Sequence, residues 1–98
     1  LSEQRPARQL RYFSISTKVE FSNDEAGFTE VHITAADRPG ILSGIGKVLL
    51  GAHFNVHAAR IATLGERIDD VFLLSNKAGL PLSNSEQDTV RELLMQKL

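Results

Sequence analysis

Hydrophobic and polar residues alternate in two stretches of the first third of the chain. Residues 18–22 and residues 29–36 place apolar side chains at every second position, the pattern of a strand with one buried face. A cluster of turn-forming residues, 23–27, separates the two stretches. The pattern therefore predicts two strands joined as a hairpin.

After residue 36 the apolar period changes from two to 3.6, which predicts a helix. Its apolar face, which we expect to cover the sheet, is formed by Ile41, Leu42, Ile45, Val48 and Leu49. A residue before proline avoids helical geometry, so we expect Arg38 to be the N-cap and Pro39 to be the first helical residue. Gly51 is expected to mark the end of the helix.

Two glycines, Gly44 and Gly46, lie inside this helix. Each costs about 0.5–1 kcal/mol relative to alanine in a helix interior. We expect another segment to approach the helix backbone closely at these positions. The alternative is a helix that is merely weak.

The second half of the chain predicts two more strands. Residues 55–63 form the third, with apolar positions that change face between Ala58 and Ala59, as a β-bulge or burial on both faces would produce. A turn at Leu64-Gly65 leads to residues 68–74, which carry apolar side chains on both faces. Such a strand is typical of the centre of a sheet or of a dimer contact.

A capping box, Ser83-Asn84-Ser85-Glu86, opens a second helix. The order of elements predicts a single α+β domain, a four-stranded antiparallel sheet with two helices on one face in the order ββαββα. Ninety-eight residues bury enough surface for only one core. Residues 1–16 lack a period and are predicted to be a linker or the tail of a preceding domain, and residues 17–98 the domain itself.

Composition narrows the classes of partner. Eleven basic and 12 acidic residues give a net charge of −1, so we expect no nucleic acid partner. The chain has no cysteine, which rules out disulfides and thiolate metal sites. It also lacks an apolar run near the roughly 18 residues of a membrane span, so we expect no membrane and a cytoplasmic location.

The candidate binding site with the most support from the sequence is the strand-to-helix junction, residues 37–40. The first N–H groups of a helix are unpaired and attract anions. An α-amino acid needs such donors for its carboxylate and acceptors for its ammonium group. We expect the amides of Gly40, Ile41 and Leu42 to meet the carboxylate, Asp37 or strand-end carbonyls to meet the ammonium, and Asn55 to contact the side chain. The alternative is that Asp37 merely caps the helix and Asn55 merely begins a strand.

Residues 27–98 resemble an ACT domain, an amino-acid-sensing module of metabolic enzymes, through residues 36–42, 55–56 and 61–65. Residues 59–72 are similar to the last ACT domain of the bifunctional enzymes that uridylylate and deuridylylate the nitrogen-regulatory protein PII. The resemblance implies a non-catalytic regulatory segment without a cofactor, attached to nucleotidyltransferase and hydrolase domains that use magnesium. It also implies glutamine, PII and a neighbouring ACT domain or second copy as partners.

The resemblance places the ligand between the loop after the first ACT strand of one copy and the second ACT strand of another. The matching positions here are Asp37, Arg38, Pro39, Gly40, Ile41 and Leu42 on one side, and Asn55, Val56 and His57 on the other. The usual element order, βαββαβ, is not followed, because an extra strand at residues 18–22 precedes the first ACT strand. We expect this extra strand to take the fourth place in the sheet.

Other chemistry has weaker support. The three histidines have no metal-ligand spacing. Glu66, Asp69 and Asp70 flank a turn without a nearby base or nucleophile, so we expect solvated strand edges rather than paired catalytic carboxylates. Arg38 is either a counter-ion for the ligand carboxylate or a solvated side chain. Three functions remain open: a glutamine sensor, a structural oligomerisation module, and a sensor of another amino acid in a different metabolic regulator.

Overall fold

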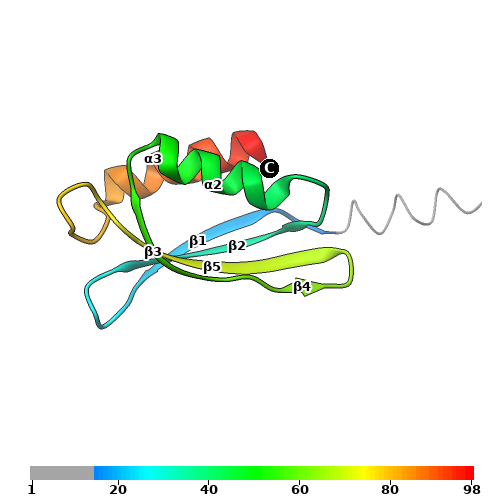
Figure 1. The fold of residues 1–98 in the computed structure, drawn as a ribbon, viewed down its shortest axis with the longest axis horizontal. Coiled ribbons are helices and arrows are strands. Elements are labelled where there is room, and N and C mark those ends of the chain that lie inside the picture. Colours follow the sequence, from blue (N-terminus) through cyan, green and yellow to red (C-terminus); the bar gives the residue numbers. More distant parts are fainter. Residues whose placement is uncertain (1–14) are drawn as a thin grey trace, which may run out of the picture.

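The computed structural model describes residues 15–98, in which an antiparallel sheet is covered on one face by two helices (Figure 1). Residues 1–14 of the predicted linker lie outside the described part of the chain. The strands are β1 Lys18–Asn23, β2 Thr29–Ala36, β3 Asn55–Arg60, β4 Thr63–Leu64 and β5 Arg67–Ser75. The helices are α2 Ile41–Gly51 and α3 Asn84–Lys97. The predicted α+β class, with two helices on one face of an antiparallel sheet, is confirmed, and the architecture is that of a ferredoxin-like ACT domain as the resemblance implies.

The strand order across the sheet is β1-β2-β5-β3, with β4 pairing with β5 beyond the end of β3. The extra strand β1 therefore occupies the edge beside β2, as predicted, with Val19 opposite Ile33. The strand with apolar residues on both faces, β5, lies between β2 and β3 and is central. Its position explains why both of its faces carry apolar side chains.

Two details of the predicted third strand are wrong. It is divided into β3 and β4, and the register shift falls between Val56 and Ala58 rather than between Ala58 and Ala59. The division arises because the chain leaves the ladder at Ala62, whose N–H donates to the Asp70 carboxylate at 3.1 Å. A side-chain acceptor thus replaces the backbone acceptor that a continuous ladder would supply.

The core lies between the sheet and the two helices. Alternate side chains of β2 and β5 face it, and Ile45, Leu49, Val90 and Leu94 from the helices are fully buried against them. At the start of β2, Thr29 is fully buried and its Oγ1 accepts the Leu82 N–H at 2.9 Å. This hydrogen bond anchors the segment leading to α3.

The helix start of α3 matches the prediction. Ser83 is the N-cap, its Oγ accepts the Glu86 N–H at 3.2 Å, and the Glu86 carboxylate accepts the Ser83 N–H at 2.9 Å. This reciprocal pair is the predicted capping box. Hydrogen bonding from the Ser83 amide lowers the pKa of Glu86.

No helix in residues 15–98 is long and apolar enough to cross a membrane.

Candidate ligand-binding site

The predicted binding loop is a tight turn, and α2 begins later than expected. The Ile41 N–H donates to the Arg38 carbonyl at 3.2 Å, and Gly40 between them has φ 79° and ψ 2°. These angles, with proline before the glycine, define a type II turn. Gly40 is therefore the N-cap of α2, and the prediction of Arg38 as N-cap with Pro39 as first helical residue is wrong. The left-handed backbone of Gly40 cannot continue a helix.

The turn leaves some of the expected donors available. The Ile41 N–H is already used by the turn, and the Gly44 N–H donates to the Gly40 carbonyl at 2.9 Å. Within residues 15–98, the N–H groups of Gly40 and Leu42 make no hydrogen bond. Two of the three predicted amide donors are thus free to meet an anion.

Asp37 does not cap the helix. Its backbone N–H donates to the Glu66 carbonyl at 2.8 Å, which fixes the end of β2 against the turn before β5. Its carboxylate is on an exposed residue and makes no hydrogen bond within the described part of the chain. The carboxylate therefore remains available for a cation near the turn.

Arg38 has a structural role that neither sequence interpretation anticipated. Its Nη1 and Nη2 donate to the carbonyls of Leu98 and Lys97 at 2.8 and 2.5 Å. The guanidinium thus satisfies orphan carbonyls at the negative end of α3. The exposed guanidinium is therefore held at the end of α3 within this chain. The assignment of Arg38 as a ligand contact stays a prediction.

A small hollow of about 190 Å³ lies between the turn and the end of α3. A Cβ at Gly44 would lie 3.2 Å from the Lys97 Cε, so the expected close approach to the helix backbone occurs here. At Gly46 no heavy atom lies within 4 Å of such a Cβ, and the expectation is wrong for that position.

The second half of the predicted site lies at the start of β3, at the opposite end of the sheet from the turn. The Nδ2 of Asn55 donates to the Asn76 carbonyl at 3.1 Å, and the Nε2 of His57 lies 2.7 Å from the Ser75 Oγ. The His57 ring stacks on Phe28 with centroids 4.1 Å apart. Asn55 therefore keeps its side-chain oxygen unengaged within the described residues, whereas the His57 ring is packed and hydrogen-bonded.

One chain cannot bring the two halves together. Ala36 pairs with Arg67 at the start of β5, and Asn55 pairs with Ser75 at its end. Eight residues of strand separate these positions, about 26 Å at roughly 3.3 Å per residue. A ligand that touches both the turn and the start of β3 must therefore lie between two copies.

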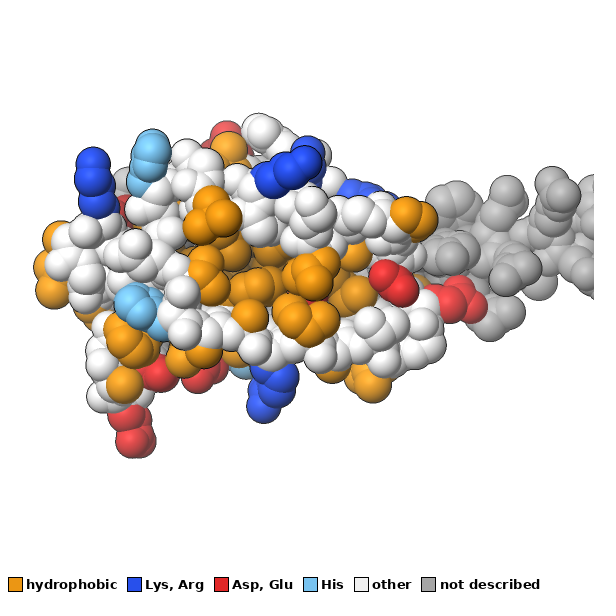
Figure 2. Space-filling model, viewed as in Figure 1, with side chains coloured by type: hydrophobic (Ala, Val, Ile, Leu, Met, Phe, Trp, Pro, Cys, Tyr) orange, Lys and Arg blue, Asp and Glu red, His pale blue; other side chains and the backbone are white. Residues whose placement is uncertain are grey.

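The edge of the sheet is suited to such a contact. All six residues of β3 are exposed, and β3 is an edge strand whose outer backbone groups have no strand partner in residues 15–98. Figure 2 shows hydrophobic side chains gathered between α2 and this edge of the sheet. The exposed large hydrophobic residues of these elements are Leu42, Leu50, Val56 and Leu64. An unpaired edge beside apolar side chains is a template for pairing with another chain.

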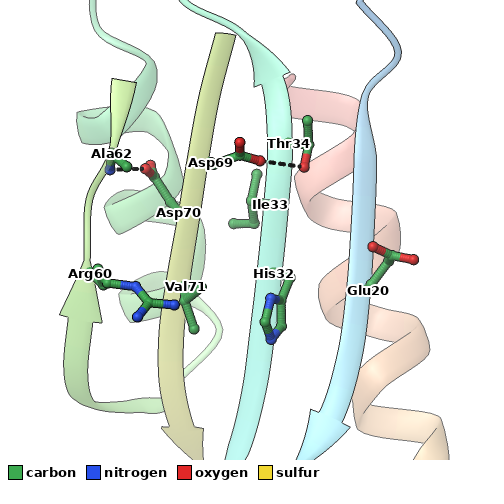
Figure 3. Close-up of a pocket in the computed structure, with 9 residues that line it drawn as sticks. All are labelled: Glu20, His32, Ile33, Thr34, Arg60, Ala62, Asp69, Asp70 and Val71. Atoms are coloured by element: carbon green, nitrogen blue, oxygen red, sulfur yellow. Dashed lines mark hydrogen bonds between the residues drawn. The ribbon is translucent and has the colours of Figure 1, made fainter. Parts of the chain in front are cut away.

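One of the acidic residues that follow the Leu64-Gly65 turn is less solvated than expected. Asp70 is only 2% exposed, and burial raises the pKa of its carboxyl group. The hydrogen bond from the Ala62 N–H lowers this pKa, and the negative charges of Asp69 and Asp37 raise it further. Asp69 accepts from the Thr34 Oγ1 at 3.0 Å (Figure 3). The prediction of solvated strand edges is therefore wrong for Asp70. Its alternation on β5 could have signalled burial, because it shares a face with Ile68 and Phe72.

The histidines lie apart: His32 on β2, His53 after α2 and His57 on β3. Within residues 15–98, no group of three or more His, Cys, Asp or Glu residues is arranged to hold a metal ion. These residues therefore offer no ligand set for the magnesium that the resemblance implies for the larger enzyme.

The fold and this edge define a class of protein: a small ferredoxin-like α+β domain with an exposed edge strand and a tight turn at a helix start. Residues 29–91 match the ACT domain family model, and the chain belongs to the ACT domain family.

Curated relatives are similar over nearly the whole chain. The bifunctional uridylyltransferase/uridylyl-removing enzyme of Xanthomonas axonopodis pv. citri is 42% identical over 96% of this chain, and that of Legionella pneumophila strain Corby is 35% identical over 97%. The chain spans only 12% and 11% of the length of these two relatives. A crystal structure of an unknown protein from Galdieria sulphuraria has a TM-score of 0.60 at 24% identity, covering 74% of this chain and 39% of that one, which supports the fold alone.

Proposed function

We propose that this chain is the glutamine-sensing ACT domain of a bifunctional uridylyltransferase/uridylyl-removing enzyme that modifies PII in the cytoplasm. The similarity to enzymes of that name supports the choice of parent. The observation that carries ligand binding is the pair of free N–H groups, of Gly40 and Leu42, beside the unengaged carboxylate of Asp37. Catalysis by the parent belongs to other parts of the enzyme.

In this proposal the α-carboxylate of glutamine accepts from the Gly40 and Leu42 amides at the positive end of the α2 dipole. The ammonium group pairs with the Asp37 carboxylate. The side-chain amide of glutamine donates to the unengaged oxygen of Asn55 from a second copy. Glutamate lacks that donor, so its carboxylate would face an acceptor, and a site with an unpaired acceptor discriminates against it.

The second copy pairs through β3. Antiparallel pairing of two β3 strands across a two-fold axis directs the Asn55 end of one copy toward the α2 start of the other. Such an interface is isologous and creates two equal sites per dimer. Val56, 39% exposed, contributes apolar surface to it.

Regulation follows if glutamine binds one arrangement of the ACT copies more tightly than another. A ligand shifts an equilibrium only by its differential affinity for the two states. Coupling free energies of this kind are typically about 1–3 kcal/mol, enough to bias the parent between its two opposed activities.

Calorimetry of the dimeric chain with glutamine, glutamate and other amino acids tests the ligand. We expect heat with glutamine and a Kd about 5- to 150-fold weaker for glutamate, since a buried unpaired acceptor costs roughly 1–3 kcal/mol. Asp37→Asn should weaken glutamine binding by tenfold or more, because it removes a charged partner of the ammonium. Asp88→Asn, an exposed aspartate on α3, is the matched control and should bind normally.

Complementation tests whether the site is shared between copies. Asp37→Asn and Asn55→Ala each damage both sites of a homodimer. In a mixed dimer one site carries both changes and the other carries neither, so mixing the two weak-binding variants should restore tight sites. If the mixture binds no better than its components, the shared site is wrong.

The exposed edge and its apolar side chains favour a second candidate, a purely structural oligomerisation module. It predicts a dimer that gives no heat with any amino acid. A sensor of a different amino acid in another regulator predicts heat with that amino acid and not with glutamine.

A further inference from the structure

The sheet face opposite the helices carries a transverse row of four side chains, one from each main strand. Glu20 pairs with His32, His32 with Val71, and Val71 with Arg60. Because directly paired residues point to the same face, all four lie on this open face, across β1, β2, β5 and β3 (Figure 3). The row runs from an acid at one edge to a cation at the other.

Within residues 15–98, the charged side chains at the two ends of the row have no partner. Neither the Glu20 carboxylate nor the Arg60 guanidinium takes part in an ion pair or a side-chain hydrogen bond there. Two neighbouring pairs lie on the same face: His32 Nε2 is 2.9 Å from Glu30, and Arg67 is 3.2 Å from Asp69. Lys18 of β1, which pairs with Thr34 on this face, forms no ion pair within residues 15–98. Within the row itself, the charges of Glu20 and Arg60 are therefore the ones left for a contact with another molecule.

The open face is also hollowed. One hollow of about 390 Å³ includes the row and Asp69, and a second of about 230 Å³ next to it is lined by Ala58, Val71 and Leu73 among others. The centre of the face thus combines the apolar side chains Val71 and Leu73 with two ion pairs, and its two edges carry Glu20 and Arg60. Such a mixture of apolar and charged surface is compatible with a protein contact.

We propose that a second copy of this chain docks on the open face, about a two-fold axis that runs parallel to the strands between β2 and β5. This rotation reverses the row, so Glu20 of each copy faces Arg60 of the other and His32 faces Val71. In the adjacent row, where Thr34 pairs with Asp69, the same rotation sets the Thr34 hydroxyl opposite the Asp69 carboxylate. The row is complementary to its own reverse, and that property selects a second copy as the occupant.

The size of the face sets the strength of the contact. Four strands at about 4.8 Å spacing and eight residues at about 3.3 Å give roughly 500 Å² per copy. The total of about 1,000 Å² is at the lower limit of specific interfaces, so docking is weak and depends on low ionic strength.

Cysteine pairs test the geometry directly, because the chain has no cysteine of its own. Chains carrying Glu20→Cys are mixed with chains carrying Arg60→Cys under mild oxidation. We expect mixed disulfide dimers well above those formed by Glu20→Cys with Glu92→Cys, an exposed position on α3. Crosslinking no greater than in this control overturns the proposal.

Charge reversal tests the complementarity. Glu20→Arg and Arg60→Glu should each weaken this association about tenfold in sedimentation experiments at low salt, because each places like charges opposite one another twice per dimer. The double variant restores opposite charges and should associate as the wild type does. Glu20 lies on β1, at the edge away from β3, so this rescue cannot come from pairing of the β3 edges. Absence of rescue contradicts the proposal.

The proposal is independent of ligand binding. Glutamine uses the turn at α2 and the β3 edge, whereas Glu20 lies on the other edge of the sheet. Glu20→Arg should therefore leave glutamine binding unchanged while it weakens docking. Failure of face docking with intact glutamine binding would remove this proposal alone.

Discussion

Alanine at two glycines of the turn and of α2, Gly40 and Gly46, is expected to change stability in opposite directions. Gly40 has φ 79°, and a Cβ there would meet no heavy atom within 4 Å. The cost of Gly40→Ala is therefore that of an L side chain in left-handed backbone, about 1–2 kcal/mol. Against a typical stability of about 5–15 kcal/mol the domain still folds, with a strained turn.

Gly46 is the matched control. It lies inside α2, its backbone has no positive φ, and a Cβ there would also meet no heavy atom within 4 Å. Gly46→Ala should therefore stabilise the domain by about 0.5–1 kcal/mol through helix propensity. Gly44→Ala should gain less than Gly46→Ala, because its Cβ would press on the flexible Lys97 side chain at 3.2 Å.

Urea unfolding followed by circular dichroism measures these differences, with the m value checked for constancy. The Gly40 and Gly46 variants should differ by about 1.5–3 kcal/mol. In thermal unfolding each kcal/mol corresponds to about 4–8 °C for a domain of this size. The reasoning is refuted if Gly40→Ala is as stable as the wild type or if Gly46→Ala is the less stable of the two. In a parallel titration, only Gly40→Ala should weaken glutamine binding.

Three further changes test other parts of the structure. Burial raises the pKa of Asp70 in the folded chain above its value in the unfolded chain. At pH values between the two, the folded chain binds more protons than the unfolded chain, so the free energy of unfolding falls as pH rises. Asp70→Asn should flatten this slope. Thr29→Val should cost about 1–3 kcal/mol in urea unfolding, because the buried Leu82 N–H loses its acceptor. Ser83→Ala should cost about 1 kcal/mol by removing the acceptor for the Glu86 N–H at the start of α3.

The first two of these changes have a clear contrary result. An unchanged pH slope in Asp70→Asn, from stability measured at several pH values, would show that burial does not shift this group. Thr89→Val, on an exposed residue of α3, is the control for Thr29→Val and should cost much less. Equal losses in the two threonine variants would contradict the role given to the buried hydroxyl.

The candidate site shows where prediction from sequence reached its limit. The switch from period two to 3.6 correctly located the strand-to-helix junction, and the proline and glycine marked a turn. The same residues did not predict how the turn closes: the rule for a residue before proline made Arg38 the N-cap, whereas Arg38 is the first residue of a type II turn and Gly40 is the N-cap. Its actual partners, the carbonyls of Lys97 and Leu98, are about 60 residues away in the chain. No local pattern carries that contact.

The amino-acid sequence alone determines those features that depend only on residues close together in the chain. Alternation, helical periodicity, turn formers and the capping box depend only on neighbours in the chain, and from them follow the elements, the two-layer fold and the location of the junction. Contacts between distant residues depend on packing, which only the folded chain decides. Examples are the burial of Asp70, the interruption at Ala62 and the separation of Asn55 from Gly40. Burial and long-range pairing follow from how the layers fit together, and many sequences with the same local pattern would fit differently.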